Sequence, residues 1–529
     1  MRKFINVLLC LSMVLLLFGC SASQSEAPAQ KPENTAVEGP ASFYETKTTE
    51  YGYIDMYNNL SARKAYTKYR EFASRYLQNA ASVNENEILS PLSLYYVLAI
   101  LSNGASGNTR AQIENALGVC TEDLNAFLKD VNQMDLGGYE KMYSMSNTLW
   151  FNTAKGLSLK QDFVDTINEY YGSGAEEYDF GDASGLVQKA NDWAKQNTDG
   201  SIDHILDEND VDDSTMFLLL NALAAGSEWA YQFDSADTLY QEFNCYDRQV
   251  NVTEMMHQEF GGYWHLDNCE GFEKYLDCGL TFVAMLPNGN TDIYDFVSSL
   301  NGDTLKDFFE SYTEWENETN DDKGCSADYH ITKLAFPKFK YEKEYELRTA
   351  LSRMGLEDIF NYQTADFSAM AQGDESLISL LELKEVKQKC SIEVNEEKVE
   401  AAAVTAAIGG LGAGGCDVRD YIYHEITFDR PFVFFIVENG RDLTMPLFMG
   451  IVTKLGEPVE KAMLIENITG KINIRSMPST KGEKLGSFAK GETYYCLEKQ
   501  ENEGYTWYRI GENRWVADKN GEWIKEIAH

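Results

Sequence analysis

The sequence predicts an α+β fold followed by a small all-β module, and two observations carry this prediction. Between residues 60 and 455, helical patterns and strand-like runs intermix without the regular alternation that a doubly wound sheet requires. After Glu457 and Pro458 the pattern changes to short strands at roughly even spacing, separated by Gly, Asn and Pro residues. This second pattern is typical of a small β-barrel that is closed or half-closed.

The first 20 residues predict export rather than a folded element. A basic MRK start is followed by the apolar run INVLLCLSMVLLLF and then by Gly19 and Cys20. The closing LFGC resembles the lipobox of bacterial lipoproteins, which implies a signal peptide at residues 1–19 and a lipid on Cys20. An ordinary secretory signal with an incidental cysteine is the alternative. Residues 20–58, rich in Ser, Ala, Pro, Glu and Thr, then predict a flexible tether.

Apolar periodicity predicts the first helix and the clearest strands of the α+β region. Large apolar residues recur at helical spacing near its start: Tyr66, Tyr69, Phe72, Tyr76 and Leu77. Short runs rich in apolar residues predict strands at 217–220, 280–286, 426–428 and 431–437.

Composition and motifs exclude several classes of function. The net charge of −39, from 84 acidic against 45 basic residues, lacks the basic footprint of a nucleic-acid-binding protein. The glycine run at 410–415 matches the dinucleotide-binding pattern G-x-G-x-x-G, but alanines precede it and a loop leading into a strand follows it, which is the wrong context. The sequence also lacks zinc-ligand spacing, a nucleophile elbow and a phosphate loop, so it predicts neither an enzyme nor a bound cofactor or metal.

The stretch EEKVEAAAVTAAIGGLGAGGCDVRDY spans residues 396–421. If its first half formed a strand, its side chains would alternate between two faces. One face would be small and mostly apolar, fit to slide between strands already in place: Val399, Ala401, Ala403, Thr405 and Ala407. The opposite face would carry Glu400, Ala402, Val404 and Ala406. The glycine run predicts an exposed, pliable loop, and a surface loop without a role is the alternative.

Five stretches resemble the serpin family, and they occur in the family's order. Residues 88–118, which include ILSPLSLYYVLAI, and residues 215–234, which include LLLNALAAGSEW, resemble an early helix and a central strand. The runs LAFPKFKYEKEYELRTALSRMGLEDIF at 334–360 and FDRPFVFFIVENGRDLTMPLFMGIV at 428–452 match the family's middle and C-terminal signatures. The run SIEVNEEKVEAAAVTAA at 391–407 resembles the reactive-loop hinge.

The resemblance covers about residues 60–455 and implies a serpin domain at 59–457. The fold that it implies has a large central β-sheet, two further sheets and about eight or nine helices. The activity that it implies is inhibition of a serine protease, or of a cysteine protease, by a chain that performs no chemistry of its own. The protease would cleave the loop and form an acyl-enzyme, and the freed hinge would insert into the central sheet before water could release the protease.

The resemblance also implies roles for particular residues. The hinge would comprise Glu396, Glu397, Lys398, Val399, Glu400, Ala401, Ala402, Ala403, Val404 and Thr405. Lys398 and Val399 depart from the family, which usually carries Gly and then Thr or Ser at these positions.

A hydrogen-bonded network at the shutter, where the sheet opens, would contain Ser90, Ser93 and Asn221. Gln388 stands where many family members carry His, a departure that would alter the opening barrier. Trp229 would lie at the breach, where the hinge enters the sheet. For the two serines, capping of a helix is the other role, and both roles can coexist.

Two positions remain candidates for the scissile bond. Counting forward from the hinge by the family's spacing favours Leu411, Gly412 and Ala413, whose small neighbours suit an elastase-like or subtilisin-like protease. Counting back from the C-terminal signature reaches Asp420, next to Arg419, which would suit a trypsin-like protease.

Residues 463–529 resemble bacterial SH3-like domains, which attach to the peptide or glycan of the cell wall. Tyr505, Trp507 and Trp515 are the wall-binding candidates, and a place in the core of so small a domain is the alternative for them. Lipid at Cys20 and a peptidoglycan-binding tail would hold the inhibitor at the outer face of the cell membrane. Two other functions stay open: a non-inhibitory serpin acting as a surface scaffold, and an anchored adhesion or solute-binding lipoprotein.

Overall fold

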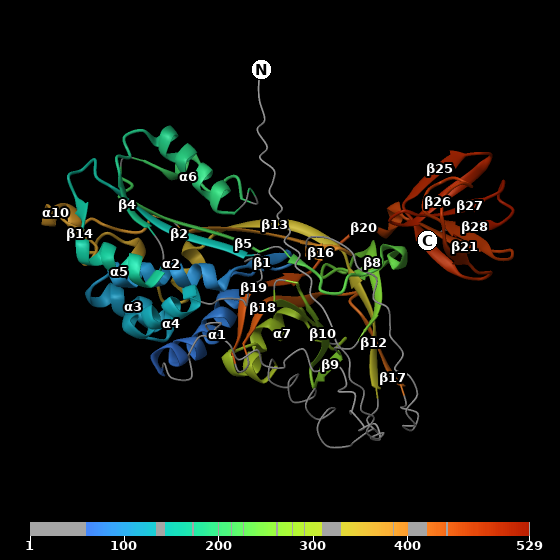
Figure 1. Cartoon of the computed structure of the whole chain (residues 1–529), viewed down its shortest axis with the longest axis horizontal. Helices are drawn as coiled ribbons and strands as arrows, with labels where there is room; N and C mark the ends of the chain where they lie inside the picture. The colour runs from blue at the N-terminus through green and yellow to red at the C-terminus, as the bar shows by residue number, and fades with distance from the viewer. Residues whose placement is uncertain are drawn as a thin grey trace, which may run out of the picture. The chain divides into compact units, whose positions relative to one another are not determined.

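The structure is a computed structural model (Figure 1). It describes residues 60–133, 143–171, 174–198, 200, 202–212, 214–225, 227–260, 263–277, 279–289, 291–308, 329–384, 386–399, 421–440 and 443–527.

Helix α1 (Leu60–Ala80) confirms the helix that the aromatic periodicity predicts, and its Tyr69, Phe72 and Tyr76 are buried. Helix α2 (Pro91–Gly104) is buried along almost its whole length. It begins after Ser90, whose hydroxyl accepts the N–H of Ser93 at 3.2 Å, as expected of a helix cap. The other helices are α3 (Gly107–Leu117), α4 (Thr121–Gln133), α5 (Gln161–Tyr171), α6 (Ala183–Asn197), α7 (Ile293–Ser299), α9 (Arg348–Arg353) and α10 (Glu375–Ile378).

A six-stranded sheet has the order β1-β19-β18-β11-β10-β9. It contains the predicted strands at 280–286 and 431–437, which the structure extends to β11 (Leu280–Pro287) and β18 (Phe432–Gly440). Every residue of β11 is buried, in agreement with an apolar run that only Thr281 interrupts. The remaining strands are β1 (Glu87–Leu89), β9 (Tyr263–Leu266), β10 (Cys269–Tyr275) and β19 (Leu443–Val452).

A second sheet has the order β17-β12-β8-β20, with β7 paired to β8. The strand predicted at 426–428 is the end of β17 (Tyr421–Thr427), one residue earlier than expected. The others are β7 (Leu239–Asn244), β8 (Val250–Phe260), β12 (Tyr329–Pro337) and β20 (Glu457–Pro458).

The third group of strands forms two hydrogen-bonded halves. One half has the order β4-β2-β5, with β4 (Gly174–Tyr178), β2 (Tyr143–Asn152) and β5 (Phe217–Ala225), so the strand predicted at 217–220 is longer than expected. The other half pairs β13 (Phe339–Glu346) with β15 (Lys387–Val394). Strands β5 and β15 are neighbours, yet within the described residues no ladder joins them. We call the space between these two strands the gap.

Two short ladders complete the α+β region. Strand β6 (Ser227–Glu228), which follows β5, pairs with β16 (Lys398–Val399), and β3 (Ser158–Leu159) pairs with β14 (Ala371–Gln372). Figure 1 shows β2, β5 and β13 crossing the molecule beneath α6, with α2 on the other side of the strands.

Residues 463–527, which we call the C-terminal module, form short strands, as the sequence predicts. A core of their own, separate from the main core, includes Ile465, Phe488, Ile510 and Val516. The strands form two sheets, of order β24-β21-β28 and β23-β22-β27-β26-β25. Their bounds are β21 (Met463–Asn467), β22 (Ile472–Arg475), β23 (Lys484–Phe488), β24 (Thr493–Cys496), β25 (Glu498–Asn502), β26 (Tyr505–Gly511), β27 (Arg514–Asp518) and β28 (Ile524–Ile527).

Within the described residues, five cysteines are free thiols: Cys120, Cys245, Cys269, Cys390 and Cys496. In the same part of the chain, no helix is long and apolar enough to span a membrane.

Candidate functional site

The start of the predicted hinge is fixed by a buried glutamate. The Glu396 carboxylate accepts the Thr238 hydroxyl at 2.6 Å and pairs with the Lys338 ammonium at 2.9 Å. Its backbone carbonyl accepts the N–H of Phe233 at 3.0 Å. Because the side chain of Glu396 is only 7% exposed, these partners satisfy a carboxylate that water cannot reach freely.

A tight turn after β15 sends the chain back toward β6. Asn395 closes it, because its N–H donates to the Lys398 carbonyl at 2.7 Å and its side-chain oxygen accepts the N–H of Lys398 at 2.8 Å. The indole N–H of Trp229 donates to the Asn395 carbonyl at 2.8 Å. The structure therefore places Trp229, which was predicted to lie at the breach, in contact with the turn at which the hinge begins.

The hinge then continues as strand β16, which forms a two-stranded ladder with β6. Lys398 lies opposite Glu228, and Val399 lies opposite Ser227, in an antiparallel ladder. Since β6 follows β5 along the chain, the first residues of the hinge are already paired at one end of the gap.

Farther along, the segment before η1 (Glu208–Asp210) lines a narrow cavity at the gap together with Asn221 of β5 and Lys389 of β15. The Lys387 ammonium of β15 pairs with Asp210 at 2.6 Å. A strand inserted between β5 and β15 would have to displace this segment.

Polar side chains connect the two halves of the sheet beneath the gap. Ser93 donates its hydroxyl to the side-chain oxygen of Asn221 on β5. Gln388 on β15 exchanges two hydrogen bonds with the Ser90 backbone, at 3.0 and 2.9 Å, and accepts the Tyr76 hydroxyl at 2.9 Å. The structure thus brings together Ser90, Ser93, Asn221 and Gln388, which we call the polar bridge. Ser90 also caps α2, so the two roles considered for it coexist in the geometry.

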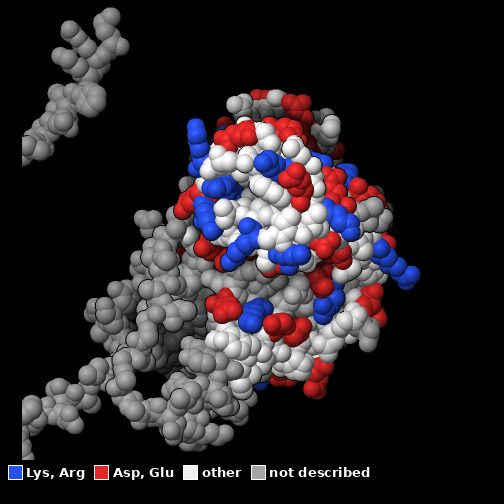
Figure 2. Space-filling model, turned by 90° about the vertical axis from the view of Figure 1, so that its right-hand side faces the viewer, with Lys and Arg blue, Asp and Glu red and all other residues white. Residues whose placement is uncertain are grey.

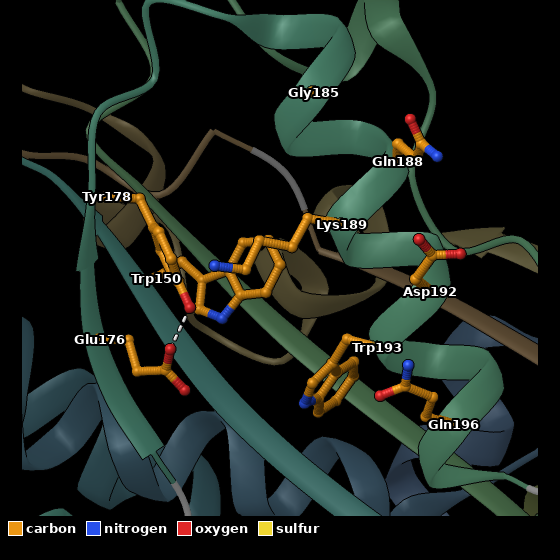
Figure 3. A pocket seen from close by; sticks show the side chains of 9 residues that line it. All are labelled: Trp150, Glu176, Tyr178, Gly185, Gln188, Lys189, Asp192, Trp193 and Gln196. Atoms are coloured by element: carbon orange, nitrogen blue, oxygen red, sulfur yellow. Dashed lines mark hydrogen bonds between the residues drawn. The ribbon is translucent and has the colours of Figure 1, made fainter.

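Helix α6 packs on the sheet through a small apolar cluster that is separate from the main core. A cavity of about 600 Å³ opens beside it (Figure 3). There the Lys189 ammonium of α6 lies 3.7 Å from the centre of the Tyr178 ring, and that ring lies 4.8 Å from Trp150. Because this cluster is separate from the main core, α6 can shift without opening the main core.

The wall-binding candidates lie in different surroundings. Trp507 and Trp515 are buried, at 1% and 7% exposure. Tyr505 lines a cavity of about 310 Å³, together with Trp507, Trp523, Lys471 and Arg475. Figure 2, which faces the end that carries the C-terminal module, shows Lys and Arg interspersed with Asp and Glu around an uncharged area. Residues 463–527 contain ten basic and ten acidic residues, so the charge of −39 lies elsewhere in the chain.

Several predicted residues lie outside the described part of the chain. They are the lipidation residue Cys20, the hinge residues Glu400, Ala401, Ala402, Ala403, Val404 and Thr405, and the scissile candidates Leu411, Gly412, Ala413 and Arg419. Sequence reasoning also missed residues that the structure places at the hinge: Thr238, Phe233, Lys338 and Asn395. Lys338, inside the apolar run LAFPKFK, was the one available signal, because a charge among apolar residues needs a partner when it is buried.

Comparison with known proteins agrees with this architecture. The family model described as Serpin (serine protease inhibitor) matches residues 67–455. The chain is 30% identical to human Serpin B8 over 363 residues, which are 67% of this chain and 89% of that protein. It is 30% identical to rat Leukocyte elastase inhibitor A over 366 residues, which are 68% of this chain and 91% of that protein.

Among solved structures, the native state of the thermophilic serpin Tengpin superposes with a TM-score of 0.63 at 29% identity, covering 77% of this chain and 96% of that one. Its latent state superposes with a TM-score of 0.58 at 28% identity, covering 75% of this chain and 98% of that one. The split sheet, the hinge beside it and these matches define a protein of the protease-inhibitor class. The chain belongs to the serpin family.

Proposed function

We propose that this chain inhibits serine-type proteases as a suicide substrate. A protease attacks the loop within residues 401–420 and becomes joined to it as an acyl-enzyme. The hinge then inserts between β5 and β15, and the bound protease is carried away from its productive geometry. The free energy comes from the ladder hydrogen bonds and the burial that insertion adds to a metastable fold.

The register of β16 on β6 is the observation that carries this proposal. If the antiparallel ladder of Lys398 with Glu228 and Val399 with Ser227 continued along β5, Thr405 would lie opposite Asn221. On the other side, the turn that pairs Asn395 with Lys398 would, by the same continuation, place Thr405 opposite Gln388. Both continuations would therefore bring the same hinge residue, Thr405, into the polar bridge.

This register also assigns the faces of the inserted strand. Asn221 and Gln388 point toward α2, where Ser93 and Ser90 bind them, and residues directly opposite in a sheet share a face. Thr405 would consequently point toward α2, and so would Ala401, four residues before it. Because the inner side of the sheet is already packed, only small side chains of the inserted strand would fit on that side.

The decisive experiment compares arginine at adjacent hinge positions. Ala401→Arg would force a charge into the core side of the sheet, whereas Ala402→Arg would point away from it. We expect the wild-type chain and A402R to form an SDS-resistant covalent complex with a serine protease, and A401R to be cleaved as an ordinary substrate. Equal trapping by both variants would contradict insertion, and a wild-type chain that is only nicked would instead be a non-inhibitory scaffold.

The target and the location are part of the same proposal. The small residues that neighbour the candidates Leu411, Gly412 and Ala413 favour an elastase-like or subtilisin-like protease, and sequencing the fragment released by a protease panel would distinguish these candidates from Arg419. Lipid at Cys20 would anchor the chain at the outer face of the membrane. The C-terminal module, as an SH3-like domain, would bind cell-wall peptide or glycan, and the aromatic cavity at Tyr505 supports this role.

A further inference from the structure

Lys338, which lies between β12 and β13, joins three parts of the chain. Its ammonium pairs with Glu396 at the hinge at 2.9 Å, with Glu254 on β8 at 3.6 Å, and with Glu512 of the C-terminal module. The Lys338 side chain is 17% exposed. Charges in such a setting interact more strongly than they would in water.

The C-terminal module reaches this cluster through a packed interface. Leu239 of β7 packs against the core of the module, and Tyr240 packs with Tyr495 and Leu497. Arg509 donates to the Tyr240 hydroxyl at 2.9 Å. These apolar and polar contacts together hold the β26–β27 turn, which carries Glu512, beside the serpin domain.

The same turn touches a second residue of the hinge site. A side chain on Gly511 would place its Cβ 2.3 Å from the Thr238 carbonyl, so the two backbones are in direct contact. The Thr238 hydroxyl in turn donates to Glu396. Glu396 is therefore linked to the module twice, through Lys338 and through Thr238.

Three carboxylates surround Lys338, and one of them, Glu254, also interacts with the charge of Arg509. One ammonium faces three carboxylates, and like charges that share a site oppose one another. Burial lowers the pKa of Lys338, but its hydrogen bond to Glu512 and the charges of Glu254 and Glu396 outweigh burial and raise that pKa above its ordinary value. Lys338 therefore stays charged at neutral pH, and its one positive charge interacts with three carboxylates at the same time.

We propose that Glu512 is a positioning residue for loop insertion, because it competes with Glu396 for Lys338 and so weakens the hold on the start of the hinge. The C-terminal module is then part of the inhibitory mechanism as well as an attachment device. This inference rests on the proposed function, since it concerns the release of the same hinge.

The test replaces one carboxylate by an amide in the full-length chain. Glu512→Gln keeps an oxygen acceptor for Lys338 but removes the competing charge. We expect hydrogen exchange at the amides of Trp229 and Phe233, which donate to the Glu397 and Glu396 carbonyls, to slow by roughly two- to fivefold. Glu466→Gln is the matched control, because Glu466 pairs with Lys525 inside the module, and it should leave this exchange unchanged.

A double substitution decides whether the effect runs through the hinge glutamate. In a Glu396→Gln background, Glu512→Gln should no longer alter the exchange, because the hinge residue then carries no charge whose attraction to Lys338 Glu512 could weaken. An effect of equal size in that background would overturn the proposal, as would unchanged or faster exchange in the single variant. The rate of protease trapping should fall in Glu512→Gln and stay at the wild-type value in Glu466→Gln.

These outcomes are distinguishable from failure of the proposed function. The exchange measurement contains no protease, so it reports the coupling between module and hinge directly. A wild-type chain that traps no protease would overturn the proposed inhibition even if the exchange responded as expected.

Discussion

Lys274 places a charge in apolar surroundings close to the breach. Its ammonium lies 5.6 Å from the centre of the Trp229 ring and 4.8 Å from that of Phe233, and it donates to the side-chain oxygen of Gln258 at 2.6 Å. Burial lowers the pKa of Lys274 from 10.5 to about 7. The aromatic faces and one amide oxygen thus compensate only part of the lost hydration.

This buried lysine predicts an unusual pH dependence of stability. Between pH 7 and 10.5 the unfolded chain binds the Lys274 proton more tightly than the folded chain, so stability should increase as the pH rises through this window. The contribution of one such group is at most about 1.4 kcal/mol per pH unit. Thermal unfolding of the wild-type chain and of Lys274→Met at several pH values would measure it.

The Lys274→Met variant serves as its own reference, because the other titrating groups are the same in both chains. The wild-type unfolding temperature should rise relative to that of the variant as the pH increases from 7 to 9.5. Parallel curves would show that Lys274 does not titrate in this range.

At the scale of the elements, the gap between β5 and β15 is the feature on which the proposed inhibition depends. The segment that ends in η1 borders it, and the pair of Lys387 with Asp210 attaches this segment to β15. The side chains of the two residues are 20% and 13% exposed, so solvent screens the pair only in part.

Removing that attachment should lower the barrier to opening the gap. We expect Lys387→Met to insert its loop spontaneously several-fold faster than the wild-type chain, since a partly buried ion pair of about 1 kcal/mol no longer has to be broken. The half-life of inhibitory activity during incubation at a fixed elevated temperature would measure this rate.

Lys389→Met is the matched control on the same strand. Lys389 pairs at 3.6 Å with Glu342 of β13, within one half of the sheet, and this pair does not cross the gap. Its loss should leave the half-life near that of the wild type. Equal acceleration by both substitutions would point to general destabilisation of β15 instead.

Local patterns predicted the elements better than the connections between them. The aromatic spacing of α1 and the apolar run of β11 sufficed, because a helix with one buried face leaves a periodic pattern and a strand buried on both faces leaves an apolar run. The large central sheet and the residues of the polar bridge followed only from the resemblance. The pair of Lys338 with Glu512 joins residues 174 positions apart, and no local pattern announces such a contact. Trp507 shows the same limit, since an aromatic residue of a small barrel can equally bind a ligand or fill the core.

At the scale of the whole molecule, the main core and the core of the C-terminal module are separate clusters. Loop insertion would change the sheet that lies over the main core and leave the core of the module as it is. Unfolding of the C-terminal module can therefore serve as an internal control. Insertion should change the stability of the serpin domain and leave that of the module unchanged.

Cleavage of the loop between residues 401 and 420 should make the serpin domain markedly more stable. An inserted strand gains ladder hydrogen bonds on both sides, each worth about 1 kcal/mol net, so the unfolding temperature should rise by roughly 10 °C or more. Calorimetry before and after limited proteolysis measures this rise, and any separate transition of the C-terminal module should stay in place. Ala401→Arg, cut at the same loop but barred from insertion, should show no such rise. An unchanged unfolding temperature in the cleaved wild-type chain would mean that the native fold stores no free energy for trapping a protease.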